Sequence, residues 1–223
     1  MAKKLKKIEK LASESLLNGL RLHRDSITLY KNGAIPSSYM LSILSQEEIG
    51  KSFLTNDVVF QDVDNVGIDS KYAGKIVNAM LSHRIKQASF SREVDDFLKY
   101  HGKKYPRIIS EISSGKLNER KQNATYVGVT KKGNKPDLIG GKLIIPIRKV
   151  KPEQAKFHIT RVNDFLISLI EGSRRGLLYI EDPIDKLLTI DLVKELEVLW
   201  PNKSKEAIFK LRKYRRYDIE DES

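Results

Sequence analysis

The sequence predicts a mainly α-helical protein, a helical bundle with one short β-prone or extended segment and extra helices at the C-terminal end. Apolar residues recur at three- and four-residue spacing along most of the 223 residues, which is the period of a helix with one buried face. Hydrophobic residues make up 40% and charged residues 31% of the chain, values typical of a globular protein with a core. The longest apolar run, residues 143–147, is too short to span a bilayer.

Three long helices are expected in the first part of the chain. The first covers residues 4–31 and ends at an Asn-Gly pair, because glycine readily takes the left-handed backbone conformation that terminates helices. The second covers residues 36–60 and opens with a proline, which is favoured in the first turn of a helix. Asp69 or Ser70 caps the third, whose apolar face includes Leu81.

Shorter elements follow the third helix. Two β-prone runs flank a turn-rich basic stretch, so they can pair as a small hairpin or form an extended loop. The expected elements are short helical pieces over 92–115, β-prone runs at 124–129 and 143–147, a helix over 152–171, and two more helices over 184–199 and 203–216.

The charge of the chain favours a polyanionic partner. Lys and Arg number 41 against 29 Asp and Glu, which gives a formal net charge of +12. The field of such a chain attracts RNA, DNA or an anionic membrane face, although a generally basic, solvated surface explains the composition equally well. Near the C-terminus, cations alternate with tyrosines, a composition in which bases can stack while phosphates are neutralised. The candidate RNA-binding cations of this tail are Arg212, Lys213, Arg215 and Arg216.

Two charged residues on the second helix fall where a plain core helix carries Leu or Ile. On a helical wheel, Glu47 and Lys51 lie at the centre of the apolar stripe that contains Ile43. Buried charge is tolerated only when it is paired or used in function. Gly50 costs a helix about 1 kcal/mol relative to Ala, so we expect it to permit close approach of another backbone or a ligand. The alternative is an internal Glu47–Lys51 ion pair that only fixes the helix register.

Two further stretches carry candidate polar groups. His83 borders the apolar stripe of the third helix and is either a general acid–base and partner of Glu47 or a structural histidine. Arg120 and Asn123 precede the change from helix to extended chain, where polar side chains can converge on a cleft. Tyr126 and Arg120 together suit a base face and a phosphate oxygen, whereas a capped helix end with a solvated arginine is the simpler interpretation.

Several kinds of site are not indicated. There is no phosphate-cradling glycine loop and no His-Glu-x-x-His motif, and the four histidines show no metal-ligand spacing. We therefore expect no metal site and no cofactor. The absence of cysteine excludes disulfides and thiolate metal sites. No secretion signal or membrane segment is evident, so we expect a cytoplasmic protein.

The charged stretches occur in an order that resembles the AbiV family of abortive infection proteins, which belongs to the HEPN superfamily. The resembling elements are Glu-Glu-x-Gly-Lys on the second helix, then His-x-x-Lys, then Gln-x-x-x-Tyr-Val leading to a proline. The matching residues are Tyr39, Leu41, Glu47, Glu48, Gly50, Lys51, His83, Lys86, Gln122, Tyr126, Val127 and Pro146. The resemblance covers about residues 8–172. It implies an AbiV-like HEPN helical domain over 1–172 and leaves a C-terminal helical extension over 173–223.

The resemblance also implies a function. AbiV-type proteins act in abortive infection, in which a phage-infected cell arrests its own growth or translation, and the wider superfamily is rich in RNases of toxin and antiviral systems. The residues that it places in a catalytic polar centre are Glu47, Lys51, His83 and Arg120, and those that it places around this centre for RNA binding are Lys86, Asn123 and Tyr126.

Two activities remain open at this point. One is metal-independent endonucleolytic cleavage of RNA by a toxin, and the other is non-catalytic binding to RNA or to the ribosome that inhibits translation. Many HEPN nucleases carry an Arg, then four to six residues, then a His. No pair with this spacing occurs here, and Arg148 and His158 are too far apart. The family role further implies a homodimer and control by a phage-encoded activator or an inhibitory partner protein.

Overall fold

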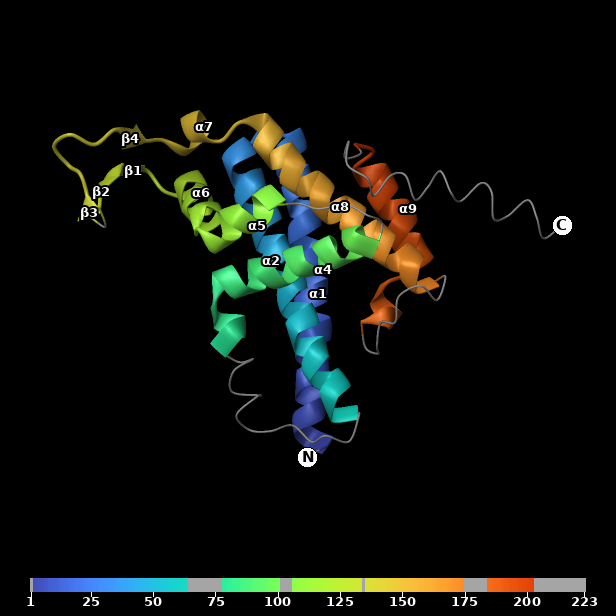
Figure 1. The fold of residues 1–223 in the computed structure, drawn as a ribbon. Coiled ribbons are helices and arrows are strands. Elements are labelled where there is room, and N and C mark those ends of the chain that lie inside the picture. Colours follow the sequence, from blue (N-terminus) through green and yellow to red (C-terminus); the bar gives the residue numbers. More distant parts are fainter. Residues whose placement is uncertain (1, 64–77, 101–105, 134, 175–183, 203–223) are drawn as a thin grey trace.

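The computed structural model is mainly helical, and it describes residues 2–63, 78–100, 106–133, 135–174 and 184–202. Its elements are α1 Ala2–Lys31, α2 Ile35–Val63, α4 His83–Tyr100, α5 Pro106–Ser113, α6 Lys116–Thr125, β1 Gly128–Val129, β2 Lys131–Lys132, β3 Lys135–Pro136, β4 Leu143–Ile144, α7 Pro146–Lys149, α8 Pro152–Arg174, the 3₁₀ helix η1 Asp185–Leu187 and α9 Ile190–Leu199. Figure 1 shows the long helices gathered into a bundle, with the short strands in an arm at one side. None of the described helices has the length and apolar character needed to cross a membrane.

Helices α1 and α2, both predicted from the sequence, form a long antiparallel hairpin. The chain turns at Gly33, whose φ of 76° lies in the left-handed region that glycine favours. Buried serines of α2 donate to carbonyl oxygens of α1. Ser45 Oγ bonds the carbonyl oxygen of Gly19 at 2.7 Å, and Ser52 Oγ bonds that of Ala12 at 2.8 Å. These small side chains let the two helix backbones lie close together.

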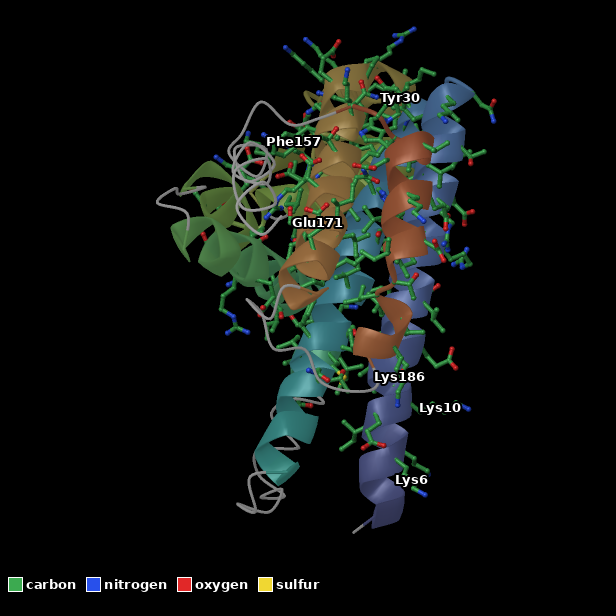
Figure 2. All side chains as sticks on the ribbon, turned by 90° about the vertical axis from the view of Figure 1, so that its right-hand side faces the viewer. Lys6, Lys10, Tyr30, Phe157, Glu171 and Lys186 are labelled. Atoms are coloured by element: carbon green, nitrogen blue, oxygen red, sulfur yellow. The ribbon has the colours of Figure 1, made fainter. Side chains whose placement is uncertain are left out.

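Helix α8 packs at the centre of the bundle and confirms the helix predicted over 152–171. Its residue Phe165 is buried in one core cluster with Leu16 of α1 and Leu196 of α9. Figure 2 shows α8 and α9 lying against the α1–α2 pair, while Lys10 projects from the N-terminal part of α1. A single core therefore connects the first and last described helices.

This core extends past the predicted domain boundary. Leu188, just before α9, and Leu192, within α9, are buried in the same cluster as residues of α1 and α8. The division into 1–172 and 173–223 stays a prediction. The last predicted helix, 203–216, and with it the tail cations Arg212, Lys213, Arg215 and Arg216, lie outside the described residues.

The two β-prone runs pair as a hairpin, which was one of the two interpretations of the sequence. Strand β1 is antiparallel to β4, with Gly128 opposite Ile144 and Val129 opposite Leu143. Strands β2 and β3 pair further out along the same arm. The first run is shorter than predicted because α6 continues to Thr125. The residues of β2 and β3 are exposed, so the arm presents lysines to solvent.

The third predicted helix is not continuous. Its predicted start lies outside the described residues, residues 78–81 are helical, and the chain breaks at Ser82. Helix α4 then begins at His83, and Ser82 Oγ accepts a hydrogen bond from the backbone N–H of Ile85 at 3.4 Å, as an N-capping serine does. The prediction that His83 lies on the third helix is therefore wrong. Leu81, predicted to be buried, is 78% exposed.

Two buried histidines affect the acid stability of the bundle. Nε2 of His23 lies 3.1 Å from Oδ1 of Asn163, and Nδ1 of His158 lies 3.0 Å from Nε2 of Gln46. Burial lowers the pKa of His23 to about 4 and that of His158 to about 3. Both side chains are therefore neutral in the folded protein at neutral pH.

We expect the free energy of unfolding to fall as the pH drops below 6.5. The unfolded chain binds a proton at each histidine near the ordinary pKa of 6.5, whereas folded His158 binds one only near pH 3. Each histidine contributes a slope of up to about 1.4 kcal/mol per pH unit in this window. Urea unfolding at pH 7 and at about pH 5 checks this expectation. His158→Gln should lose less stability on acidification than the wild type, and an equal loss would contradict the assignment.

Candidate active site

A buried carboxylate, Glu47, forms the centre of the candidate site. It lies in the middle of α2, and its side chain is 1% exposed. Its Oε2 lies 2.6 Å from Nδ1 of His83, and its Oε1 accepts hydrogen bonds from Lys121 Nζ at 2.6 Å and from Gln87 Nε2 at 2.7 Å. Both oxygens are thus hydrogen-bonded, as a buried charge requires. We call these four residues the Glu47 cluster.

His83 is the exposed member of the Glu47 cluster. It is the first residue of α4, and its side chain is 53% exposed. Because a carboxylate only accepts hydrogen bonds, the contact with Glu47 assigns a proton to Nδ1 of the imidazole. The other ring nitrogen, Nε2, is then the one that can exchange a proton with a molecule bound from solvent.

Lys121 supplies the positive charge of the Glu47 cluster. Helix α6 buries Leu117, Lys121 and Ala124, which share one face of the helix. The ammonium of Lys121 bonds Glu47 and also lies 3.2 Å from Nδ1 of His83, and only 9% of its side chain is exposed. This cation compensates a buried carboxylate that would otherwise be strongly destabilising.

Gly50 brings α4 against α2. A Cβ added at Gly50 would lie 2.2 Å from the carbonyl oxygen of Lys86 and 2.9 Å from the backbone nitrogen of Phe90. No side chain fits at this distance unless α4 moves away from α2. The prediction that Gly50 permits close approach of another backbone is confirmed. The contact lies one turn along α4 from His83, so it also sets how closely His83 approaches Glu47.

Lys51 lies outside the Glu47 cluster. Its Nζ bonds Oε2 of Glu48 at 2.7 Å, and Asn18 Nδ2 bonds the same oxygen at 3.0 Å. The four-residue spacing allowed an ion pair between Glu47 and Lys51. In the structure, Lys51 pairs with Glu48 instead. Burial raises the pKa of Glu48, but the hydrogen bonds from Lys51 and Asn18 and the charge of Lys86 together outweigh it, so the pKa lies below its usual value.

Arg120 and Asn123 do not join the Glu47 cluster; their side chains line a different part of the structure. Nη1 of Arg120 lies 2.8 Å from Oε2 of Glu111. Arg120 and Asn123 also line a small pocket together with Tyr39. Tyr126 follows the end of α6 and is 68% exposed.

The structure brings together two of the four predicted catalytic residues. Glu47 and His83 are in direct contact, whereas Lys51 and Arg120 pair with other carboxylates. The cation that contacts Glu47 is Lys121, the neighbour of Arg120 in the sequence.

Sequence reasoning overlooked Lys121 and Gln87, although their spacing carried a signal. Lys121 comes four residues after Leu117 and three before Ala124, so it belongs to the buried face of α6. Gln87 comes four residues after His83 and therefore lies on the same side of α4.

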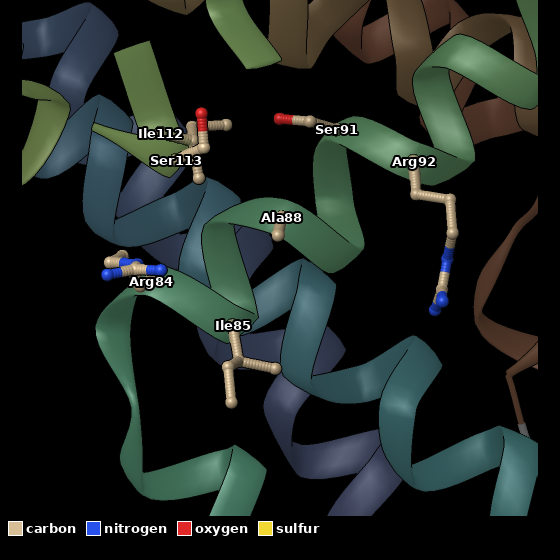
Figure 3. Close-up of a pocket in the computed structure, with 7 residues that line it drawn as sticks. All are labelled: Arg84, Ile85, Ala88, Ser91, Arg92, Ile112 and Ser113. Atoms are coloured by element: carbon tan, nitrogen blue, oxygen red, sulfur yellow. The ribbon is translucent and has the colours of Figure 1, made fainter. Parts of the chain in front are cut away.

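A separate apolar cavity of about 400 Å³ opens between α4 and α5. Figure 3 shows its lining residues, which are Arg84, Ile85, Ala88, Ser91 and Arg92 of α4 and Ile112 and Ser113 of α5. These residues include no acid–base pair, so the Glu47 cluster is the better candidate for chemistry. Among the residues that the structure describes, no three His, Asp or Glu side chains lie together as metal ligands would.

The helical bundle, with a polar cluster held between α2, α4 and α6, defines the class of protein as a HEPN-like helical domain. The chain belongs to the AbiV family, because the HEPN_AbiV family model, described as AbiV, matches residues 7–167. It is therefore a phage-defence protein of the abortive-infection type, which confirms the resemblance seen in the sequence. No curated protein and no solved structure matches the chain.

Proposed function

We propose that this protein is an antiphage effector that cleaves RNA in the cytoplasm and so arrests the growth and translation of an infected cell. The proposal rests on one observation. The half-exposed imidazole of His83 is held by the buried carboxylate of Glu47, whose other oxygen is bonded by Lys121 and Gln87. A histidine oriented by a buried acid is the arrangement in which an imidazole acts as a general base or acid.

The chemistry that this arrangement supports is transesterification of RNA. Nε2 of His83 takes the proton of a ribose 2′-hydroxyl, and the 2′-oxygen attacks the adjacent phosphorus. The bond from phosphorus to the 5′-oxygen of the next nucleotide breaks, and that oxygen receives a proton from solvent water, to which the imidazolium afterwards returns the proton it took. The products are a 2′,3′-cyclic phosphate and a 5′-hydroxyl end. Glu47 stabilises the imidazolium that forms during this step.

The other polar residues of the site orient the reacting side chains or supply positive charge. Lys121 and Gln87 fix the carboxylate of Glu47, so that it orients the imidazole. Lys86 is buried one turn along α4 from His83, and we propose that its charge stabilises the negative charge that develops on the phosphoryl oxygens. The mechanism uses neither Lys51 nor Arg120.

The arm is proposed to bind the RNA backbone. Lys131, Lys132 and Lys135 are exposed on β2 and β3. Tyr126, at the base of the arm, is exposed and offers an aromatic face on which a base can stack. Such binding weakens as salt rises, because phosphate contacts release counterions. The tail cations Arg212, Lys213, Arg215 and Arg216, which lie outside the described residues, stay predicted RNA contacts.

The direct test replaces His83 with Asn in cells in which the wild type reduces plating of a phage. Asn keeps a side-chain N–H donor for Glu47 but has no Nε2, so the base is removed while the hydrogen bond can persist. General acid–base catalysis contributes about 10²–10⁴-fold. RNA cleavage after infection should therefore fall at least about 10²-fold, and protection should be lost.

The matched control is Arg21→Gln, at an exposed position on α1. It should leave both cleavage and protection unchanged. Equal cleavage by the wild type and by His83→Asn would remove the catalytic role of the imidazole.

A second function, inhibition of translation by binding alone, is favoured by the exposed lysines of the arm. It predicts protection that survives His83→Asn but disappears when Lys131, Lys132 and Lys135 are changed to Gln. It also predicts RNA or ribosome binding with a steep dependence on salt and no cut product.

The family role implies that the effector is silent in an uninfected cell. We propose that a phage-encoded activator or an inhibitory partner controls it, and that it acts as a homodimer. Light scattering during size-exclusion chromatography measures the mass directly. A mass of twice 25.5 kDa is expected, and a monomer at concentrations at which the protein protects cells would contradict the dimer.

A further inference from the structure

A second polar site lies on another side of α6 from the Glu47 cluster. It is a pocket of about 180 Å³ lined by Tyr39, Arg120, Asn123, Lys149, Val150 and Gln154. These residues come from α2, from α6, and from the α7–α8 region. The pocket has room for a phosphate-sized group and is smaller than the roughly 300–1,000 Å³ pockets that hold whole small molecules. A larger ligand would leave most of its structure outside.

Tyr39 contributes a buried hydroxyl that has no hydrogen-bond partner among the described residues. Its side chain is 1% exposed, and its ring packs in a core cluster with Ile43 and Leu117. Burial raises the pKa of Tyr39 to about 12, while the charge of Arg120 acts in the opposite direction. The hydroxyl therefore keeps its proton, lies within reach of the charge of Arg120, and can donate a hydrogen bond to an oxygen of a bound ligand.

The other polar residues that line the pocket also offer donors. Arg120 directs Nη1 to Glu111, which leaves the remaining N–H groups of its guanidinium for a ligand. The Oε1 of Gln154 accepts a hydrogen bond from a backbone N–H at 2.8 Å, so its amide nitrogen is the group left for the pocket. Asn123 contributes an amide and Lys149 an ammonium.

The pocket is positively charged as well as rich in hydrogen-bond donors. The described lining includes two cations, Arg120 and Lys149, and no carboxylate, while Arg120 also pairs with Glu111 outside this lining. A ligand rich in acceptors and negatively charged satisfies this set, and arginine pairs especially well with the oxygens of phosphate. We propose that the pocket binds a phosphate group of an RNA strand. This inference rests on the proposed function for the identity of the strand.

Helices α2 and α6 connect the phosphate pocket to the Glu47 cluster. Tyr39 and Glu47 are separated by about 12 Å along the axis of α2, given the rise of a helix. On α6, Arg120 lines the pocket while the next residue, Lys121, bonds Glu47. A strand with one phosphate in the pocket can therefore reach His83 with a nearby nucleotide, and the pocket positions the strand for cleavage.

The test uses inorganic phosphate as the probe and Tyr39→Phe as the variant. Isothermal titration calorimetry of the full chain should show phosphate binding to the wild type. A hydrogen bond to a charged group makes a large contribution, so Tyr39→Phe should weaken binding about tenfold or more. Its urea midpoint should not fall, because the lost hydroxyl has no hydrogen-bond partner in the described part of the free protein. Arg148→Gln removes a neighbouring charge outside the pocket lining and should leave phosphate binding almost unchanged.

Two RNA oligonucleotides distinguish the possible sources of the phosphate. A preference for a 5′-phosphorylated over a 5′-hydroxyl oligonucleotide that Tyr39→Phe removes identifies a terminal phosphate. Equal binding of both, weakened equally by Tyr39→Phe, identifies a phosphate within the strand. The inference is overturned if the wild type does not bind phosphate, if Arg148→Gln weakens binding as much as Tyr39→Phe, or if RNA affinity is the same in the wild type and Tyr39→Phe.

Phosphate binding by the pocket and catalysis by His83 can be disproved independently of each other. His83→Asn should bind inorganic phosphate like the wild type, because His83 does not line the pocket. Cleavage of RNA without phosphate binding would overturn the pocket alone. Phosphate binding without any RNA cleavage would overturn the catalytic role alone.

Discussion

Replacing Lys121 with Met should destabilise the protein by about 3–5 kcal/mol, the cost of leaving one partner of a buried ion pair uncompensated. Methionine keeps most of the length of the side chain but removes the ammonium that bonds Glu47 at 2.6 Å. The remaining carboxylate is 1% exposed and cannot recover the lost interaction from water. Urea unfolding at pH 7, followed by circular dichroism, measures the change in free energy.

Lys51→Met is the matched control, because it removes the same charge from α2 beside the cluster. The side chains of Lys51 and Glu48 are 20% and 17% exposed, so water compensates part of the loss, and a destabilisation of about 1 kcal/mol is expected. Equal losses in the two variants, or a larger loss in Lys51→Met, would show that Lys121 is not the main partner of the buried carboxylate.

Replacing Gly50 with Ala should separate α4 from α2. The new Cβ would meet the carbonyl oxygen of Lys86 at 2.2 Å and the backbone nitrogen of Phe90 at 2.9 Å. Since both atoms belong to the backbone, no change of rotamer relieves the contact. Overpacking of this kind costs about 3 kcal/mol, of which the better helix propensity of alanine offsets about 1 kcal/mol. The same movement pulls His83 from Glu47, so phage protection should also be lost.

Gly128→Ala is the control for a glycine that has no such contact. A Cβ at Gly128 meets nothing within 4 Å, so the free energy of unfolding should change by less than about 0.5 kcal/mol. A Gly50→Ala protein as stable and as protective as Gly128→Ala would contradict the assigned role of the close approach.

The long helices could be predicted from the sequence because their apolar spacing is repeated over many turns. The ends of α1 and α8 were placed to within a few residues, and the pairing of β1 with β4 was one of two stated possibilities. The inward position of Glu47 was predicted for the same reason, since its place on the stripe of α2 is a local property. The family match over 7–167 agrees with the order of motifs in the sequence.

The partners of Glu47 could not all be predicted, because they depend on how three helices pack. Spacing along α2 favoured Lys51 as the partner of Glu47. Instead, the packing of α6 against α2 pairs Lys121 with Glu47, and Lys51 pairs with Glu48. Arg120 and Lys121 are adjacent in the sequence, yet they face different sites.

The break before α4 was missed for a related reason. Ser82 caps α4 where the apolar pattern suggested a continuous helix, so His83 begins a helix instead of continuing one.

The chemistry of the RNA ends after infection tests the role of the Glu47 cluster most directly. A polynucleotide kinase labels 5′-hydroxyl ends without prior phosphatase treatment, so sequencing of labelled RNA maps each cut. New 5′-hydroxyl ends should appear in infected cells that carry the wild type, and should be reduced at least about 10²-fold with His83→Asn. The same ends at the same abundance in both strains, or none with a wild type that still protects, would contradict catalysis by His83 and Glu47.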